Sequence, residues 1–344
     1  MRNQKKHTLK SIALEMGVSV ATISFILNDK AEEKGISSKL IEKVKKYCDE
    51  VGYRPNPLAQ TLRTGKSQVI VVILENIYSR LARIIEEIAY QKGYQVIFCS
   101  NNNRDDKTKK LINLFKDRKV DGFIIAPSPN LESEIKKLAE DQFPLVLVDR
   151  YFEGVEANHV ITDNTLTAET VTEKLVQQGF KKILFIVPES TQSQISGRLK
   201  GYKNVIAKHS LQEHIEILPF EDKSLREENN ILKEIISKND YDAIFFATGY
   251  YARLGLEIIK SNFPEYLEDK GIYSYDDEIL FKLFTPSISA VYQPLELIGQ
   301  KLMEILLKEI DSKEELPKLK EKVVLECEFR DRESSLNKVS ITPQ

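Results

Sequence analysis

The sequence of 344 residues contains no tryptophan, three cysteines and no apolar run long enough to cross a membrane as a helix. Cys48, Cys99 and Cys327 are far apart and form neither a CxxC pair nor a zinc-ligand spacing, so we expect no disulfide framework and no metal site. No apolar signal-peptide segment follows the basic N-terminus. The sequence therefore predicts a cytoplasmic protein that has no membrane partner.

The common catalytic motifs are also missing. The sequence has no GxGxxG after a strand pattern, no GxxxxGK[ST], no HExxH and no GxSxG. Its four histidines, His7, His159, His209 and His214, show no catalytic pairing. These absences argue against an enzyme, and we expect no cofactor.

Charge is distributed unevenly along the chain. Residues 1–66 hold 13 Lys and Arg against 7 Asp and Glu, whereas the remainder holds 37 against 45. A basic head on an acidic body indicates that the head faces a nucleic acid, although ordinary scatter in composition also allows this difference.

Three short helices are predicted in the first 52 residues. Thr8 is placed to cap the first helix, and Gly17 is placed to end it. Ser19 is placed to cap the second, and residues 40–51 supply a third amphipathic segment. A tight glycine turn between the first two is typical of a helix-turn-helix module, but a small bundle that does not bind DNA fits the same spacing.

The segment "GYRPNPLAQTLRTGKS" at 52–67 is more specific. Pro55 and Pro57 disfavour helix just before them, and a short helical stretch follows at 58–63. This stretch is too short to be stable alone in water. We expect it to fold only against a second subunit and DNA.

Together, "TLKSIALEMGVSVATISFILN" and "YRPNPLAQTLRTGKS" resemble the start of transcription regulators of the lactose-repressor/galactose-repressor (LacI/GalR) family in order and spacing. The resemblance implies that the helix from Val20 enters the major groove. It also implies that a hinge helix at 56–64 wedges Leu62 into the minor groove beside its mate from a second subunit. The implied DNA-facing residues are Thr8, Ser19, Val20, Ala21, Thr22, Ser24, Phe25, Asn28, Tyr53, Asn56, Ala59, Gln60, Leu62 and Arg63.

Two features depart from the family pattern. Phe25 stands where the family usually has an arginine that reads a guanine edge. Phenylalanine cannot make that contact, but it can contact a thymine methyl group. The loop at 29–35 is also about three residues longer than the commonest version. We hypothesise that Phe25 changes the preferred operator without abolishing DNA binding.

The body alternates apolar strand patterns with amphipathic helices. "QVIVVIL" at 68–74 is typical of a buried parallel strand, and helix and strand then alternate as far as "PLVLVDR". A second series of the same kind follows Asp163. The pattern predicts two α/β lobes with parallel sheets, and a ligand cleft beyond the carboxyl ends of the strands.

The family resemblance continues through "VDGFIIAP", "GRLKGY", "YSYDD", "AVYQP" and "FRDRESS". It implies a periplasmic-binding-protein-like body and three crossings between the lobes, with the helix after residue 294 returning to the first lobe. The predicted domains are a helix-turn-helix domain with hinge at 1–66, an effector-binding and dimerisation domain at 67–335, and a tail at 336–344. Lobe 1 is predicted at about 68–164 plus 294–323, and lobe 2 at about 165–293 plus 324–332.

The resemblance also implies an effector pocket. The residues that match family pocket positions are Tyr78, Asp149, Arg150, Asp163, Arg198, Thr248, Asp276 and Gln293. For each of them, a structural ion pair or a solvated charge at the rim is the alternative. The loop after the first strand is several residues short, and Thr248 and Gly249 replace an asparagine and an aspartate that often meet ligand. With no tryptophan to stack on a sugar face, these changes remove sugar contacts.

The leading hypothesis is a homodimeric, DNA-binding transcriptional regulator, most simply a repressor. Its partners would be a pseudo-palindromic operator and a small-molecule effector such as a carbohydrate, bound between the lobes. A solute-binding protein of a transport system shares the body architecture, but the first 66 residues and the missing signal peptide disfavour it. The tail lacks a leucine heptad, so we expect a dimer without a C-terminal tetramer bundle.

Overall fold

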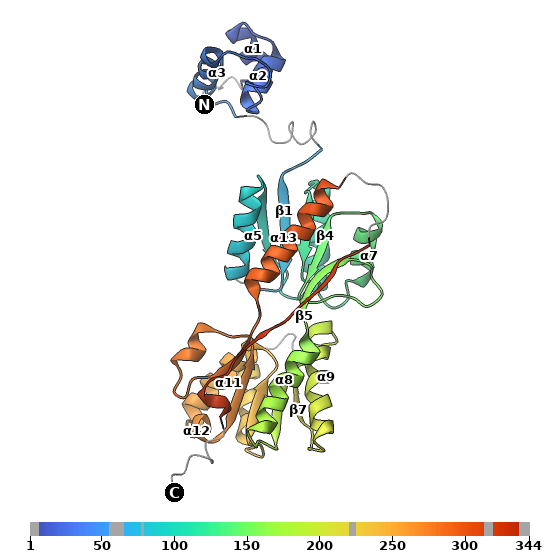
Figure 1. Ribbon diagram of the computed structural model, residues 1–344, viewed down its shortest axis with the longest axis vertical. Helices are drawn as coiled ribbons and strands as arrows, with labels where there is room; N and C mark the ends of the chain where they lie inside the picture. The colour runs from blue at the N-terminus through green and yellow to red at the C-terminus, as the bar shows by residue number, and fades with distance from the viewer. Residues whose placement is uncertain (1–6, 55–64, 77–78, 220–224, 313–318, 337–344) are drawn as a thin grey trace. The chain divides into compact units, whose positions relative to one another are not determined.

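The computed structural model describes residues 7–54, 65–76, 79–219, 225–312 and 319–336. The chain forms two compact units, Met1–Gln68 and Val69–Gln344 (Figure 1). The predicted hinge helix lies outside the described residues. So do six residues with predicted contacts, namely Asn56, Ala59, Gln60, Leu62, Arg63 and Tyr78.

The described residues of the first unit form three helices, as the capping signals predict. These are α1 (Leu9–Met16), α2 (Val20–Leu27) and α3 (Ser38–Glu50). Thr8 and Ser11 form a reciprocal capping box at the start of α1. Gly17 ends α1 with a φ of 66°, in the left-handed region that glycine adopts without strain. The Ser19 side chain then accepts a hydrogen bond from the backbone N–H of Thr22 and caps α2.

A small apolar core holds these helices together. Ile12 of α1, Ile23 and Ile26 of α2 and Val44 of α3 are all fully buried in one cluster. Ala31, in the loop after α2, is buried in the same cluster, so that loop is anchored to the core at one point.

The described residues of the body form two six-stranded sheets. In spatial order the first sheet holds β11 (Lys322–Leu325), β5 (Asn158–Thr162), β4 (Leu145–Val148), β3 (Gly122–Ile125), β1 (Val69–Leu74) and β2 (Gln95–Ser100). All its pairs are parallel. Its helices are α5 (Ser79–Gln91), α6 (Asp105–Asp117), α7 (Glu132–Glu140) and α13 (Leu295–Asp311).

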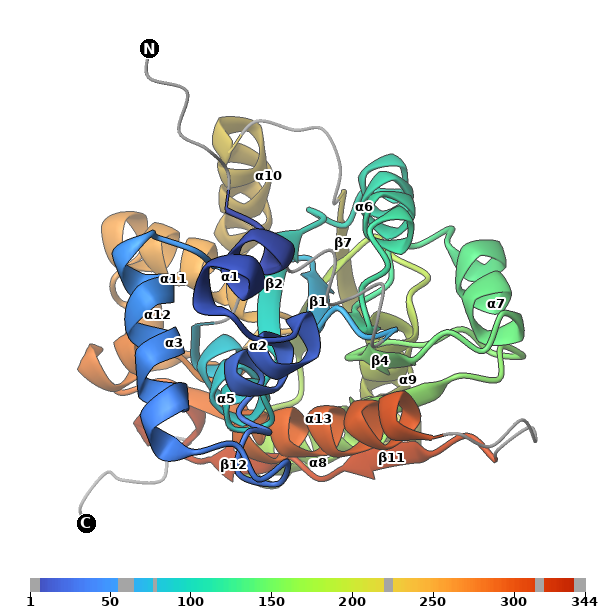
Figure 2. The same ribbon diagram turned by 90° about the horizontal axis from the view of Figure 1, so that it is seen from above.

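Helices cover both faces of the first sheet. Ile70 and Val72 of β1 pack in one cluster with α5 and α13, whereas Val71 and Ile73 pack with α6 and α7 on the other face. Figure 2 shows α13 and α5 on one side of β1 and β4, with α6 and α7 on the other. Burial on both faces explains why β1 reads as an uninterrupted apolar run.

The second sheet repeats this plan. Its spatial order is β12 (Glu328–Arg330), β10 (Ser289–Tyr292), β9 (Gly271–Tyr275), β8 (Ala243–Phe246), β6 (Ile183–Pro188) and β7 (His214–Leu218), with only the β10–β12 pair antiparallel. Its helices are α8 (Asn164–Gln177), α9 (Ser193–Lys208), α10 (Leu225–Ser237), α11 (Gly249–Asn262) and α12 (Tyr266–Asp269), with short 3-10 turns η1 (Ile279–Leu283) and η2 (Glu333–Ser335).

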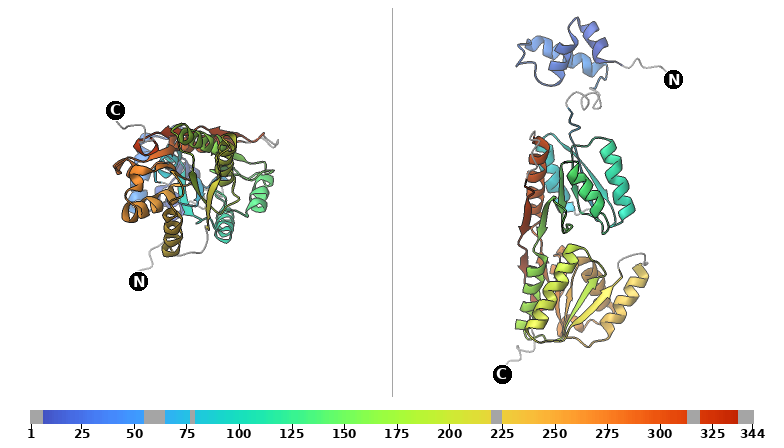
Figure 3. Two further views of the ribbon diagram at one scale, coloured as in Figure 1. Left: turned by 90° about the horizontal axis from the view of Figure 1, so that it is seen from below. Right: turned by 90° about the vertical axis from the view of Figure 1, so that its right-hand side faces the viewer.

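In this second lobe, Leu184 and Ile186 of β6 pack with α10 and α11, and Phe185 and Val187 pack with α8 and α9. The helices α8 and α9 lie side by side (Figure 3). Their close approach requires Gly201, since a Cβ there would collide with the backbone of Thr165.

The chain crosses between the lobes three times, after β5, β10 and β11. The α13 helix returns to the first lobe, as expected, and packs on α5, β3, β4 and β5. One predicted boundary is wrong: Val324 and Leu325 belong to β11 of the first sheet, so the last crossing follows residue 325 rather than 323. The strands β5, β11 and β12 were not predicted from the sequence. The apolar run of β5 is broken by Asn158, His159 and Thr162, and β11 and β12 are short and alternate exposed with half-buried residues.

Within the described residues no single helix is long and apolar enough to span a membrane. The pair α1 and α2 meets that criterion only when both are taken together across a bend of 108°. Among the same residues no group of three or more His, Cys, Asp or Glu could hold a metal ion.

Candidate functional site

The α2 helix presents one face to the core of the first unit and the other outward. Ile23 and Ile26 point into the core. Because successive residues turn by about 100° around a helix, Ala21, Ser24 and Asn28 lie on the opposite side. The Asn28 amide folds back and donates to the Ser24 carbonyl oxygen at 2.6 Å. The outward face is therefore made of small or short polar side chains, which allow close approach to a partner surface.

The first residues of α2 are the most accessible. Val20 is 41% exposed and Ala21 is exposed, whereas Ser19 and Thr22 join their hydroxyl groups at 2.9 Å in the helix cap. Thr8 is likewise engaged in the cap of α1. Tyr53 packs against the core of this unit, and burial raises the pKa of its phenol. Thr8, Ser19 and Tyr53 thus stabilise the first unit, in addition to the DNA contacts predicted for them.

Phe25 also lies on the outward side of α2, but it is only half-exposed. The Lys34 ammonium lies over its ring, 5.6 Å from the centroid. Lys34 belongs to the long loop, where its backbone N–H donates to the Ala31 carbonyl oxygen at 3.2 Å. Since Ala31 is fixed in the core, the loop places a cation beside the position where the sequence lacks the expected arginine.

The body has a large cleft between its two lobes, with a volume of about 720 Å³. The carboxyl ends of strands and the first turns of helices from both lobes line this cleft, as expected for open α/β sheets. Six predicted pocket residues line this cleft: Asp149, Arg150, Arg198, Thr248, Asp276 and Gln293. Asp163 does not line it, because its carboxylate accepts from the backbone N–H of Leu166 and caps α8.

Arg198, on α9, is the most buried cation of the cleft, with 3% of its surface exposed. Its guanidinium stacks on the Tyr275 ring, 3.5 Å from the centroid, and donates to Asn164 Oδ1 at 2.9 Å and to the Ala247 carbonyl oxygen at 2.8 Å. Among the described residues no carboxylate lies within ion-pair distance of it. The guanidinium is held in one orientation and lacks an anionic partner, a state that suits ligand binding.

Asp276 follows β9 and adopts a φ of 70°. Its carboxylate accepts from the Gln293 side-chain amide at 2.6 Å and from the backbone N–H of Gly249 at 3.2 Å. A Cβ at position 249 would lie 3.1 Å from the Asp276 Cβ, so a larger residue there would crowd this carboxylate. Gly249, a departure from the family pattern, therefore fits the position of Asp276. Thr248 caps α11 through the N–H of Tyr251.

Arg150 is engaged within its own lobe. It is 4% exposed and pairs with Glu75 at 2.7 Å and Asp149 at 3.1 Å. It also donates to Asn103 at 3.0 Å, and Asn103 in turn exchanges hydrogen bonds with Gln192 of the second lobe at 3.1 and 3.3 Å. Arg150 is therefore part of a polar network across the cleft rim rather than a free ligand contact.

Sequence reasoning missed several further polar residues of the cleft, among them Glu75, Gln194, Glu228, Tyr250 and Arg253. Gln194 is 6% exposed, and its Oε1 has no hydrogen-bond partner among the described residues. It lies four residues before Arg198 on α9, so helical spacing alone could have identified it. Glu228 gave no such signal, because only the fold brings α10 to the cleft.

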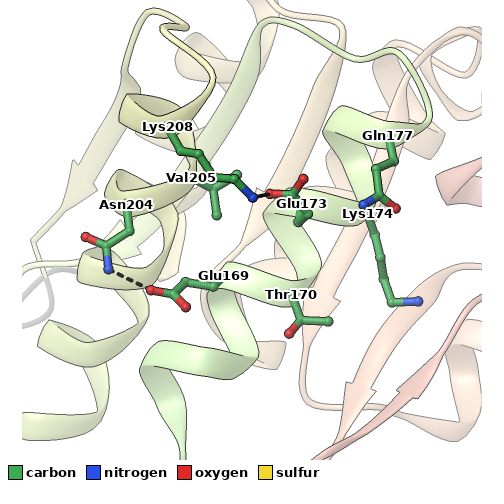
Figure 4. A pocket seen from close by; sticks show the side chains of 8 residues that line it. All are labelled: Glu169, Thr170, Glu173, Lys174, Gln177, Asn204, Val205 and Lys208. Atoms are coloured by element: carbon green, nitrogen blue, oxygen red, sulfur yellow. Dashed lines mark hydrogen bonds and ion pairs between the residues drawn. The ribbon is translucent and has the colours of Figure 1, made fainter.

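A second hollow lies between α8 and α9 on the surface of the second lobe. Figure 4 shows that its side chains pair with one another: Glu169 accepts from Asn204 at 2.6 Å, and Glu173 pairs with Lys208 at 3.1 Å. These solvated pairs are ordinary helix-surface contacts, so this hollow is not a candidate ligand site.

A three-helix unit with an outward-facing second helix, joined in one chain to a two-lobed body with a polar cleft, defines the class of ligand-responsive transcription regulators. The model of "Bacterial regulatory proteins, lacI family" matches residues 8–56. That of "Periplasmic binding proteins and sugar binding domain of LacI family" matches residues 69–258.

Individual proteins agree with these matches. The HTH-type transcriptional regulator KdgR of Bacillus subtilis is 26% identical over 331 residues, covering 92% of this chain and 96% of the relative. The sucrose operon repressor of Pediococcus pentosaceus is 29% identical over 311 residues, covering 89% and 93%. The crystal structure of the lac repressor dimer bound to operator and an anti-inducer superposes with a TM-score of 0.81 at 21% identity, covering 96% and 100%. The chain belongs to the LacI family of bacterial transcriptional regulators, which confirms the resemblance and the fold class.

Proposed function

We propose that this regulator binds a pseudo-palindromic operator as a homodimer and represses transcription. We further propose that a small molecule of the carbohydrate class, bound in the interlobe cleft, changes its affinity for the operator. This follows the functions of proteins that this chain resembles, among them a sucrose operon repressor and a lac repressor dimer on its operator. We propose no catalytic role, and a cytoplasmic location at the nucleoid.

The DNA contacts are assigned to the predicted DNA-binding domain, residues 1–66, which lies within the first unit. The outward face of α2 enters the major groove, with Val20, Ala21 and Ser24 nearest the bases. Phe25 contacts a thymine methyl group in place of the usual guanine contact. Thr8, Ser19, Thr22, Asn28 and Tyr53 stay as candidate contacts to phosphates. The hinge residues predicted from the sequence, with Leu62 as the minor-groove wedge, complete this assignment.

The effector is assigned to the body, residues 67–335, leaving 336–344 as a tail. The observation that carries this assignment is the buried Arg198 guanidinium, which faces the cleft with no carboxylate partner among the described residues. Asp276 and Gln293 provide polar groups beside it. A ligand that bridges the lobes favours one state of the dimer, and its differential affinity for two states alters operator binding.

Selection of bound sequences from random DNA, using the full-length protein, tests the DNA-binding part. We expect two inverted half-sites. Fluorescence anisotropy on the selected operator, with and without a panel of sugars, tests the effector part. If the selection enriches no sequence, the proposed DNA-binding function is wrong. If no sugar changes the operator affinity, the proposed class of effector is wrong.

A further inference from the structure

The cleft contains more negative than positive side chains. Six carboxylates line it: Glu75, Asp149, Glu228, Asp276, Asp277 and Glu278. Among the described residues only three guanidinium groups line it, those of Arg150, Arg198 and Arg253, and no described lysine does. A ligand in this cleft therefore meets an excess of negative charge.

Ion pairs inside the protein use most of the positive charge. Arg150 forms ion pairs with both Glu75 and Asp149, and Arg253 pairs with Glu278 at 3.2 Å. Asp277 is held by the two guanidinium nitrogens of Arg332, at 2.8 and 2.7 Å. These contacts leave Arg150 and Arg253 little capacity to bind an anionic group of a ligand.

Two carboxylates have no cation of their own among the described residues. The Glu228 carboxylate accepts only from the Tyr250 hydroxyl, at 2.5 Å. That of Asp276 accepts from uncharged donors, the Gln293 amide and the Gly249 N–H. Of the described lining cations, Arg198 alone has no carboxylate partner, so the uncompensated carboxylates among the described residues outnumber it by two to one.

The directions in which the pKa values of Arg198 and Glu278 are shifted agree with a negative electrostatic potential in the cleft. Burial alone lowers the pKa of Arg198, yet its pKa is raised above the ordinary value because Tyr275, Asp276 and Asp149 favour the cation. Burial raises the pKa of the Glu278 carboxyl, and Asp276 and Asp277 raise it further, against the opposing effect of Arg253.

Among the described residues of the cleft, the buried hydrogen-bonding group that still lacks a partner is an acceptor rather than a donor. The Gln194 Oε1 is a buried acceptor with no partner among the described residues. Carboxylates are acceptors only, with room for more than the donors they now have. A ligand that brings O–H or N–H donors satisfies these acceptors, whereas a carboxylate or phosphate brings more acceptors and more negative charge.

We propose that the cleft binds a polyol without negative charge and discriminates against sugar acids and sugar phosphates. This proposal rests on the effector role proposed above and specifies the class of effector. A neutral sugar donates its hydroxyl hydrogens to Asp276 and Glu228 and accepts from Arg198. An acidic analogue of the same sugar places an anion beside carboxylates that lack a cation.

The test compares sugars that differ only in charge. Full-length protein is titrated calorimetrically with D-glucose, D-glucosamine, D-glucuronate and D-glucose 6-phosphate, and with the corresponding galactose and mannose sets. Within any set that binds, we expect the acid and the phosphate to bind at least about 10-fold more weakly than the neutral sugar. An acid or phosphate that binds as tightly as its neutral parent overturns the charge inference while leaving the effector role intact. If no sugar of any set binds, both the effector role and the charge inference are overturned.

A pair of isosteric variants isolates the electrostatic cause. Glu228→Gln keeps the side-chain shape and an acceptor for Tyr250 but removes one uncompensated charge, so discrimination against the acid should fall severalfold. Glu169→Gln neutralises a carboxylate of the surface hollow in Figure 4, outside the cleft, and should leave discrimination unchanged. Equal effects of the two variants contradict a local field in the cleft.

Discussion

The two units differ in how their candidate sites are assembled. In the first unit, the proposed reading surface comes from consecutive turns of one helix, residues 20–28, whose orientation is fixed by Ile23 and Ile26. In the body, the cleft joins residues as far apart as Glu75 and Gln293. A surface on a single helix can be read from local sequence, whereas a cleft built from many segments depends on the fold. Changes in the two units should therefore separate DNA binding from effector binding.

The largest expected separation comes from the core of the first unit. Ile23→Ala truncates a fully buried side chain and should lower the free energy of unfolding of the first unit by about 2–5 kcal/mol. A unit this small is only marginally stable, so this loss should unfold it. We expect operator binding to be lost, while thermal unfolding of the body and effector binding persist. Leu14→Ala, at an exposed site on α1 with no proposed DNA contact, is the stability control. Loss of body stability in Ile23→Ala contradicts the independence of the two units.

The converse separation comes from Arg198→Ala. Deleting a buried guanidinium that meets a ligand costs about 2–5 kcal/mol of binding energy, so effector affinity should fall by more than about 30-fold. Operator affinity without effector should stay the same. Arg198→Lys should not restore effector binding, because lysine lacks the planar fork that stacks on Tyr275 and bonds to Asn164. Calorimetry and anisotropy on the same preparations measure both quantities. Full effector binding by the alanine variant contradicts the assignment of the cleft.

A smaller change should alter what the first unit reads without altering its fold. Phe25→Arg restores a bidentate donor, and we expect selection to gain a guanine at one position of each half-site, worth about 1–3 kcal/mol of discrimination. Lys34→Gln is the matched control. It removes the neighbouring cation, so it should weaken binding evenly across sequences and reduce its salt dependence. If wild-type protein already selects that guanine, our interpretation of Phe25 is wrong.

The smallest predicted effect concerns pH and the body alone. Burial holds the pKa of His159 below its ordinary value, and the ring stacks on Tyr151 at 4.8 Å between centroids. Below the ordinary histidine pKa, the unfolded chain binds a proton that the folded protein resists, so stability falls as pH drops from 7 toward 5. In His159→Gln this part of the decline should disappear, as thermal melts at several pH values would show. An unchanged decline assigns the acid sensitivity to other groups.

The sequence predicted much of the first unit because its signals are local. Thr8, Gly17 and Ser19 cap or end the helices where they were expected to do so. In the body, β1 and its neighbours were predicted because a strand buried on both faces is a continuous apolar run. By contrast, β11 and β12 are short and partly exposed, so nothing local marks them as strands. The same reasoning applies to the site: Arg198 matched a motif, whereas Glu75 and Glu228 reach the cleft only through the topology.

Selection from random DNA, with the full-length protein in the presence and absence of the best-binding neutral sugar, tests the central claim most directly. We expect a two-fold symmetric operator whose affinity changes with the sugar. We also expect that Ile23→Ala abolishes the enrichment, and that Arg198→Ala preserves it but removes the response to sugar. Enrichment of no sequence, or a sugar response that survives in Arg198→Ala, would contradict the central claim.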